Sequence, residues 1–175
     1  WQTEAGWLKG WHQPSLTARF ELSSRPMTSL AELVRSLYEY PYGCSEQTAS
    51  RLLPVLHLSA QRLSSLLERE VSPEQRQTLL QNGVDHLLSM QRHDGSFAMW
   101  NANGAEIVWN TVLAADFLQQ AHAHGLQVPA ERLEKTYQRL LRYVREGYLL
   151  DNGYSDDPAH SRLATQSYAA YVLSQ

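Results

Sequence analysis

The apolar positions of this chain follow two different spacings. Between residues 15 and 22 apolar and polar side chains alternate, which predicts a single β-strand followed by a Ser-Ser-Arg-Pro turn. From Leu30 onward the spacing is that of α-helices, in segments separated by Gly, Pro or Asn. Because one strand cannot form a sheet, we interpret residues 1–28 as the tail of a preceding β-rich domain with its linker, and residues 29–175 as an all-α domain.

The helical segments are of two kinds. Residues 75–91 and 131–148 each carry one apolar stripe, which is typical of an amphipathic outer helix. Residues 52–60, 107–121 and 163–173 are instead apolar or small almost all round, which predicts inner helices that are buried on most sides.

A glycine beside an aromatic residue recurs between outer and inner segments, at Gly43, Gly95 and Gly153. Glycine suits a tight turn that reverses the chain there, because it tolerates positive φ. The pattern predicts antiparallel helix hairpins of roughly fifty residues, stacked inner helix beside inner helix as in an α/α-toroid. Since Gln175 follows directly on an inner segment, we expect this toroid to be partial and C-terminally incomplete.

Composition and charge exclude several classes of partner. Fifteen Lys and Arg against 18 Asp and Glu give a net charge of -3 with no block of one sign, so we expect no nucleic-acid partner. No long apolar span or signal segment is present, so we expect no direct membrane insertion of this segment and any export signal to be encoded upstream. Cys44 is the single cysteine, which excludes an internal disulfide.

The residues around this cysteine suggest covalent chemistry. Residues 40–48 read Tyr-Pro-Tyr-Gly-Cys-Ser-Glu-Gln-Thr, so Cys44 lies three residues before Gln47 at the start of a helix, with both side chains on one face. Attack of the thiol on the Gln47 amide would expel ammonia and leave an internal thioester, which needs no cofactor. Such a bond persists only where water is excluded, a shielding role we assign to Tyr40 and Tyr42. The alternative is that Cys44 is a small buried hydrophobic residue.

This motif, with Ser50-Arg51-Leu52 after it, closely resembles the thioester region of the bacterial alpha-2-macroglobulin family, in its complement-like, thioester-containing domain. The segments Met90-Gln-Arg-His-Asp-Gly-Ser-Phe97, Trp109-Asn-Thr111 and Ala115-Asp-Phe-Leu118 look like the next hairpin of the same family. The resemblance covers residues 20 to 175.

The resemblance implies a broad-spectrum protease inhibitor of the bacterial periplasm or cell envelope, with a role in defence. In that family a protease cuts a bait segment, the thioester is exposed, and a lysine amine or a hydroxyl of the protease attacks it. The protease is then tethered to Gln47, and Cys44 is released as a thiol. This is acyl transfer with a single turnover, so the protein is an endopeptidase inhibitor and not an enzyme. The implied partners are target proteases and the rest of the parent macroglobulin.

Among seven histidines, His160 is the one with a candidate role, and the resemblance supplies it. In thioester proteins of the complement branch, a histidine from a later hairpin attacks the bond and forms an acyl-imidazole that favours hydroxyl targets. The alternative is a capping or surface histidine in the turn of residues 156–160. No histidine pair has the spacing that a zinc protease needs, so we predict no metal site.

Two other functions fit parts of the pattern. Gln-x-x-Asp-Gly-Ser-Phe at residues 91–97 resembles the repeat motif of terpene cyclases and protein prenyltransferases, which are α/α-toroid enzymes, but their clustered acids or zinc ligands are not visible here. The domain could also be a scaffold or binding module of the same family with an inert Cys44. Free thiol in fresh protein would favour the scaffold, and bound zinc would favour the enzyme.

Overall fold

The computed structural model describes residues 30–39, 43–147 and 157–175. Several predictions lie outside these described residues: the strand at 15–22, the shielding residues Tyr40 and Tyr42, and the turn at Gly153. The described residues form seven helices, which confirms the all-α class: α1 Leu30–Glu39, α2 Ser45–His57, α3 Ala60–Leu67, α4 Pro73–Ser89, α5 Val108–Ala123, α6 Ala130–Arg145 and α7 Pro158–Ser174. Within this part of the chain no helix is long and apolar enough to cross a membrane.

Local sequence signals set where these helices begin. Ser72 caps α4 by accepting a hydrogen bond from the Gln75 backbone N–H at 3.2 Å, and the Gln75 side chain accepts one from the Ser72 N–H at 2.8 Å. Pro73 follows in the first turn, where its missing N–H costs nothing. Asp157 caps α7 in a similar way, ahead of Pro158.

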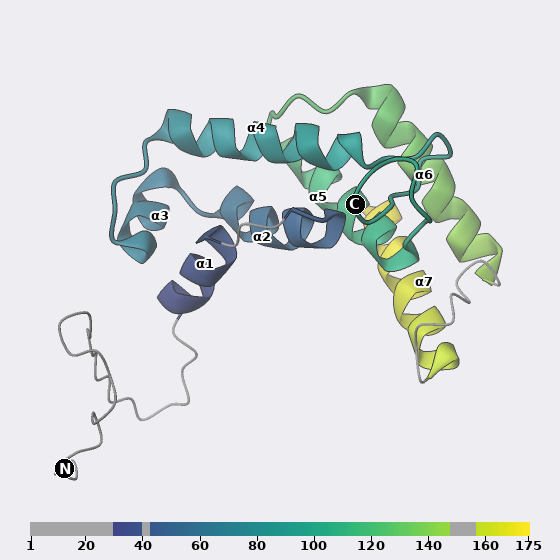
Figure 1. Cartoon of the computed structure of the whole chain (residues 1–175). Coiled ribbons are helices and arrows are strands. Elements are labelled where there is room, and N and C mark those ends of the chain that lie inside the picture. The colour runs from purple at the N-terminus through teal and green to yellow at the C-terminus, as the bar shows by residue number, and fades with distance from the viewer. Residues whose placement is uncertain (1–29, 40–42, 148–156) are drawn as a thin grey trace, which may run out of the picture.

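The helices pack as two layers (Figure 1). In one layer α2 packs against α5, and α5 packs against α7. Helices α4 and α6 form the other layer. Helix α4 covers α2 and α5, and α6 covers α5 and α7. Helices α2 and α4 run in opposite directions, as do α6 and α7. This is the stacked-hairpin arrangement that the two kinds of segment predicted.

Burial confirms the inner assignment of α5 and contradicts that of α7. Ten of the 16 residues of α5 are buried. In α7 the buried residues are Thr165, Ala169 and Val172, whereas Leu163 is 66% exposed and Tyr171 is 54% exposed. The buried positions form one stripe at helical spacing, where α5 and α6 make contact. The expectation that residues 163–173 are buried on most sides was therefore wrong, because these helices cover only one face.

One segment and one stripe also differ from expectation. The inner segment expected at residues 52–60 spans the end of α2 and the start of α3, because Ser59 caps a new helix by accepting a hydrogen bond from the Arg62 N–H at 3.1 Å. On α6 the apolar stripe was expected to include Val144, but Tyr143 is buried and Val144 is 38% exposed. The stripe predicted on α4 is confirmed, with Leu80, Val84, Leu87 and Leu88 buried.

The repeated glycines have different physical reasons. Gly95 has a φ of +84°, and a Cβ there would lie 2.1 Å from the Lys135 carbonyl oxygen, so this turn requires glycine as expected. Gly43 has no positive φ. A Cβ at position 43 would instead lie 2.8 Å from Nε2 of His86, so glycine there provides space for the histidine.

Candidate functional site

Cys44 is the N-cap residue of α2, and Gln47 is the third residue of that helix. The Gln47 backbone N–H donates to Cys44 Sγ at 3.4 Å, and the Cys44 backbone N–H donates to Gln47 Oε1 at 3.4 Å. This reciprocal pair is a capping box, which turns both side chains back over the same helix end. The structure thus brings the thiol and the carboxamide together on one turn.

Helix capping alone does not explain a cysteine at this position. Ser, Thr, Asp and Asn are the strong N-cap residues, because their oxygens accept well from the first backbone N–H groups. A thiol sulfur is a weak acceptor and caps less well. A serine would therefore stabilise the start of α2 better than Cys44, so the thiol itself points to chemistry.

The surroundings of the thiol keep water out on the protein side. Cys44 is a free cysteine with 5% of its surface exposed, and Ser45 is fully buried. The Ser45 backbone N–H donates to the Met99 carbonyl oxygen at 2.9 Å. Asn110 of α5, itself 2% exposed, donates through Nδ2 to Ser45 Oγ at 2.8 Å. The first turn of α2 is thus held against both α5 and the loop before it.

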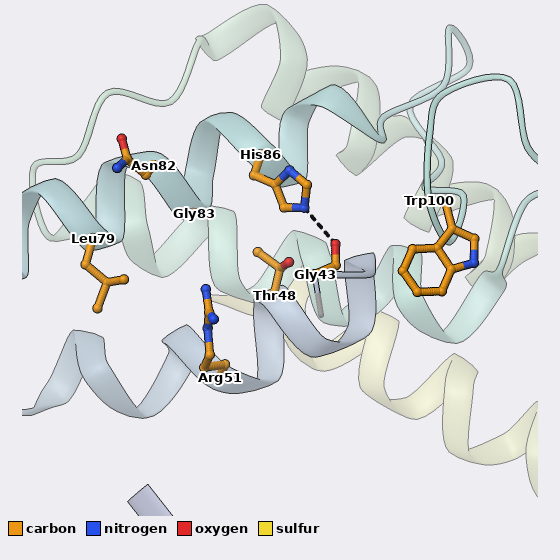
Figure 2. Close-up of a pocket in the computed structure, with 8 residues that line it drawn as sticks. All are labelled: Gly43, Thr48, Arg51, Leu79, Asn82, Gly83, His86 and Trp100. Carbon is orange, nitrogen blue, oxygen red and sulfur yellow. Dashed lines mark hydrogen bonds between the residues drawn. The ribbon is translucent and has the colours of Figure 1, made fainter. Parts of the chain in front are cut away.

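A pocket of about 510 Å³ lies between α2 and α4, and Gly43 and Thr48 of the motif line it (Figure 2). Nε2 of His86 lies 2.6 Å from the Gly43 carbonyl oxygen, and because that oxygen can only accept, the imidazole donates. Thr48 is 1% exposed, and its hydroxyl has no hydrogen-bond partner among the described residues. The residues that line the pocket are Gly43, Thr48, Arg51, Leu79, Asn82, Gly83, His86 and Trp100.

The loop that carries Met99 is tied to α6 by a charged network. Arg139 Nε donates to Glu106 Oε1 at 2.9 Å, and the Tyr143 hydroxyl donates to the same carboxylate. Hydrogen bonding to Glu106 raises the pKa of Arg139, and burial raises the pKa of Tyr143. Arg and Tyr are protonated at neutral pH even at their ordinary pKa values, so both groups act as donors and hold the loop where its Met99 carbonyl meets Ser45.

The structure places His160 on α7, away from the turn of α2 that carries Cys44. His160 is exposed in the first turn of α7, where its backbone N–H donates to Asp157 Oδ1 at 3.0 Å. Helix α5 packs against both α2 and α7, so it lies between the two segments. In the described part of the chain no group of three or more His, Cys, Asp or Glu side chains is placed to hold a metal ion.

Sequence reasoning missed two residues that contact the motif. Asn110 is polar within an otherwise apolar stretch, and a buried asparagine that needs a partner was the available signal. His86 is an exposed residue of α4 that reaches Gly43, and nothing in the spacing of α4 distinguishes it from any other surface residue.

Residues 17–166 match the family model of the A-macroglobulin TED domain. Among curated relatives, alpha-2-macroglobulin of Escherichia coli (strain K12) is 38% identical over the whole of this chain and 11% of that protein. Alpha-2-macroglobulin of Xylella fastidiosa (strain Temecula1 / ATCC 700964) is 33% identical over 95% of this chain and 10% of that protein. This chain therefore spans about a tenth of the length of these relatives.

Solved structures agree in fold. The native conformation of E. coli alpha-2-macroglobulin superposes with a TM-score of 0.79 and 40% identity, over 85% of this chain and 9% of that one. Salmonella alpha-2-macroglobulin reacted with methylamine gives 0.78 and 43%, over 85% of this chain and 10% of that one. Trypsin-activated alpha-2-macroglobulin from E. coli has a TM-score of 0.71 and 42% identity, over 77% of this chain and 9% of that one.

Proposed function

This chain belongs to the A-macroglobulin TED domain family, and from that premise we propose that Cys44 and Gln47 form an internal thioester that captures a protease covalently. Its relatives at 38% and 33% identity are bacterial alpha-2-macroglobulins, so the chain corresponds to the TED domain of such a protein. In this proposal residues 29–175 form the thioester-bearing domain, a partial α/α-toroid, and residues 1–28 belong to a preceding β-rich domain.

The chemistry has two acyl transfers. In the first, Cys44 Sγ attacks the side-chain carbonyl carbon of Gln47, the carbon–nitrogen bond breaks, and the leaving nitrogen takes the thiol proton and departs as ammonia. In the second, a lysine amine of the protease attacks the same carbon, the carbon–sulfur bond breaks, and the proton lost by the amine ends on the Cys44 thiol. The product is an amide between Gln47 and the protease, so each molecule reacts once.

The capping box is the observation that carries the proposal. It holds Sγ and the Gln47 carboxamide on one helix turn with 3.4 Å reciprocal hydrogen bonds, and such preorganisation favours an intramolecular attack. The hydrogen bond from the Gln47 N–H to Sγ also stabilises negative charge on sulfur when it leaves in the second step. Burial of Cys44 limits hydrolysis in between.

The activity of the whole protein is proposed from its relatives. The solved relatives include a Salmonella protein reacted with methylamine and E. coli proteins activated by trypsin or by porcine elastase. We therefore propose a broad-spectrum endopeptidase inhibitor of the bacterial periplasm or cell envelope. Its partners would be target proteases, bound covalently, and the rest of the parent macroglobulin.

Intact mass spectrometry of the full-length protein tests the proposal. A working thioester makes the protein lighter by one ammonia, and methylamine adds to Gln47 while one thiol equivalent appears at Cys44. Cys44→Ala should abolish the mass deficit, the methylamine uptake and the covalent capture of a protease. Cys44→Ser is the matched control for folding, because its hydroxyl keeps the N-cap of α2.

The second candidate function is a scaffold of the same family with an inert Cys44. The observation in its favour is that Cys44 is a free cysteine buried among neighbouring residues, as a small hydrophobic residue would be. Wild-type protein with a titratable thiol, no ammonia deficit and no methylamine uptake would establish this alternative and reject the thioester.

Shielding by Tyr40 and Tyr42 remains part of the proposal. If their rings limit water at the acyl carbon, replacing both by Ala in the full-length protein should speed spontaneous loss of the thioester. Replacing both by Phe is the control, because the rings remain. Equal rates of hydrolysis in the wild type and the double Ala variant would count against shielding.

A further inference from the structure

The tripeptide Gly43–Ser45 is anchored on both sides of the reactive cysteine. Before Cys44, the Gly43 carbonyl oxygen accepts a hydrogen bond from His86 Nε2 at 2.6 Å. After Cys44, Ser45 is bound twice, by the Met99 carbonyl at its N–H and by Asn110 at its hydroxyl. The anchors come from α4, from the α4–α5 loop and from α5.

The Asn110 anchor is buried and therefore specific. Ser45 is fully buried and Asn110 is 2% exposed, so an unmade hydrogen bond between them would leave polar atoms without water. The asparagine amide can donate to Ser45 Oγ only when the first turn of α2 lies against α5. This contact therefore fixes where that turn sits.

The His86 anchor acts on the peptide unit that leads into Cys44. Gly43 lies so close that a Cβ at this position would be 2.8 Å from His86 Nε2, so the glycine permits the contact. A carbonyl oxygen held from α4 orients the following N–H, which belongs to Cys44 and donates to Gln47 Oε1. The histidine thus acts on the capping box through one peptide plane.

We propose that His86 and Asn110 are positioning residues for the Cys44–Gln47 acyl group, holding the Gly43–Ser45 tripeptide so that the sulfur stays against the Gln47 carbonyl carbon. This inference rests on the proposed thioester. Neither residue reacts. They keep Cys44 Sγ aligned with the Gln47 side-chain carbonyl carbon while the bond forms. They then keep the thioester fixed and away from water until an amine arrives.

The test compares matched variants in the full-length protein. His86→Leu removes the donor at similar size, and His86→Gln retains a side-chain N–H₂ that can reach the Gly43 carbonyl. Asn110→Leu removes the buried donor, and combining it with Ser45→Ala removes the hydroxyl that it would leave without a partner. His122→Leu, on the exposed end of α5, is the control for replacing a histidine.

Three quantities are measured for each variant: the melting temperature, the fraction of molecules lighter by one ammonia, and the rate of spontaneous hydrolysis of the thioester. We expect His86→Leu and Asn110→Leu each to hydrolyse roughly fivefold to tenfold faster, the change that one lost hydrogen bond produces. His86→Gln should hydrolyse at the wild-type rate, as should His122→Leu. The double variant at Ser45 and Asn110 should remain fast.

If His86 and Asn110 only stabilised the fold, the hydrolysis rate of each variant would change in step with its melting temperature. His86→Gln would then not restore the wild-type rate. Hydrolysis at the wild-type rate in both His86→Leu and Asn110→Leu overturns the positioning role while leaving the thioester in place. Equal rates for His86→Leu and His86→Gln overturn the role of the His86 donor. Wild-type protein without methylamine uptake overturns the proposed function and, with it, this inference.

Discussion

Helices α5 and α7 have the same kind of sequence and different surroundings. Both are apolar or small almost all round, yet α5 buries ten of 16 residues and α7 buries three of 17. Helix α5 packs against α2, α4, α6 and α7, whereas the contacts of α7 with α5 and α6 lie along one stripe. The pattern shows that a helix tolerates burial, but the number of neighbours decides how much of it is buried.

The turn that carries Cys44 and the turn that carries His160 differ in burial in the same way. The first turn of α2 lies against α5, where Ser45 and Asn110 are buried together. His160 lies on the exposed first turn of α7. The proposed thioester of Cys44 and Gln47 would lie on the enclosed side, whereas His160, whose part in acyl transfer is a prediction, lies on the exposed side. Substitutions on the two helices test this contrast.

Phe117→Ala on α5 should have the largest effect on stability. Phe117 is fully buried, so its loss leaves a cavity and should lower the free energy of unfolding by about 3–5 kcal/mol. Tyr171→Ala on α7 is the matched aromatic replacement at a position that is 54% exposed, and we expect a loss below about 1 kcal/mol. Urea unfolding of this chain measures both. Similar losses would show that α7 is enclosed in solution and would remove the contrast.

Features set by neighbouring residues could be predicted from the sequence. The segments expected at 75–91, 107–121 and 131–148 correspond to α4, α5 and α6 within a few residues, because an apolar stripe and its caps are local signals. The pairing of Cys44 with Gln47 was accessible for the same reason, since the two residues are only three positions apart.

Contacts between distant residues could not be predicted. His86 and Gly43 are 43 positions apart, and Asn110 and Ser45 are 65 positions apart. Their pairing depends on how α4 and α5 pack on α2, which no local spacing encodes. The exposure of α7 was missed for the same physical reason, because burial depends on which helices lie beside it.

Tyr168→Phe should have an intermediate effect on stability, because it removes a hydrogen bond between α7 and α5. The Tyr168 hydroxyl donates to Asp116 Oδ2 of α5 at 2.7 Å. Burial, and then the hydrogen bond to Asp116, raise the pKa of Tyr168 further above neutral pH, where a tyrosine hydroxyl is already protonated and can donate. Its loss should lower the free energy of unfolding by about 1–2 kcal/mol.

Two features sharpen the interpretation of this variant. Gln120 Nε2 still donates to Asp116 Oδ1 at 2.7 Å, so the carboxylate keeps one partner and the loss stays moderate. Tyr171→Phe, on the exposed side of α7, is the control and should change stability by less than about 0.5 kcal/mol. A loss for Tyr168→Phe as small as that of the control would mean that packing alone attaches α7 to α5.

His160→Ala should have the smallest effect on stability and the most informative effect on chemistry. The cap of α7 uses the backbone N–H of residue 160 and the side chain of Asp157, so alanine keeps it, and we expect a change below about 0.5 kcal/mol. If His160 takes the acyl group as an acyl-imidazole, the full-length variant should react with methylamine as before and lose reaction with glycerol. The measurement is the ratio of amine to hydroxyl adducts by intact mass. An unchanged ratio would leave His160 as a surface histidine, and the exposed end of α7 would then have no part in acyl transfer.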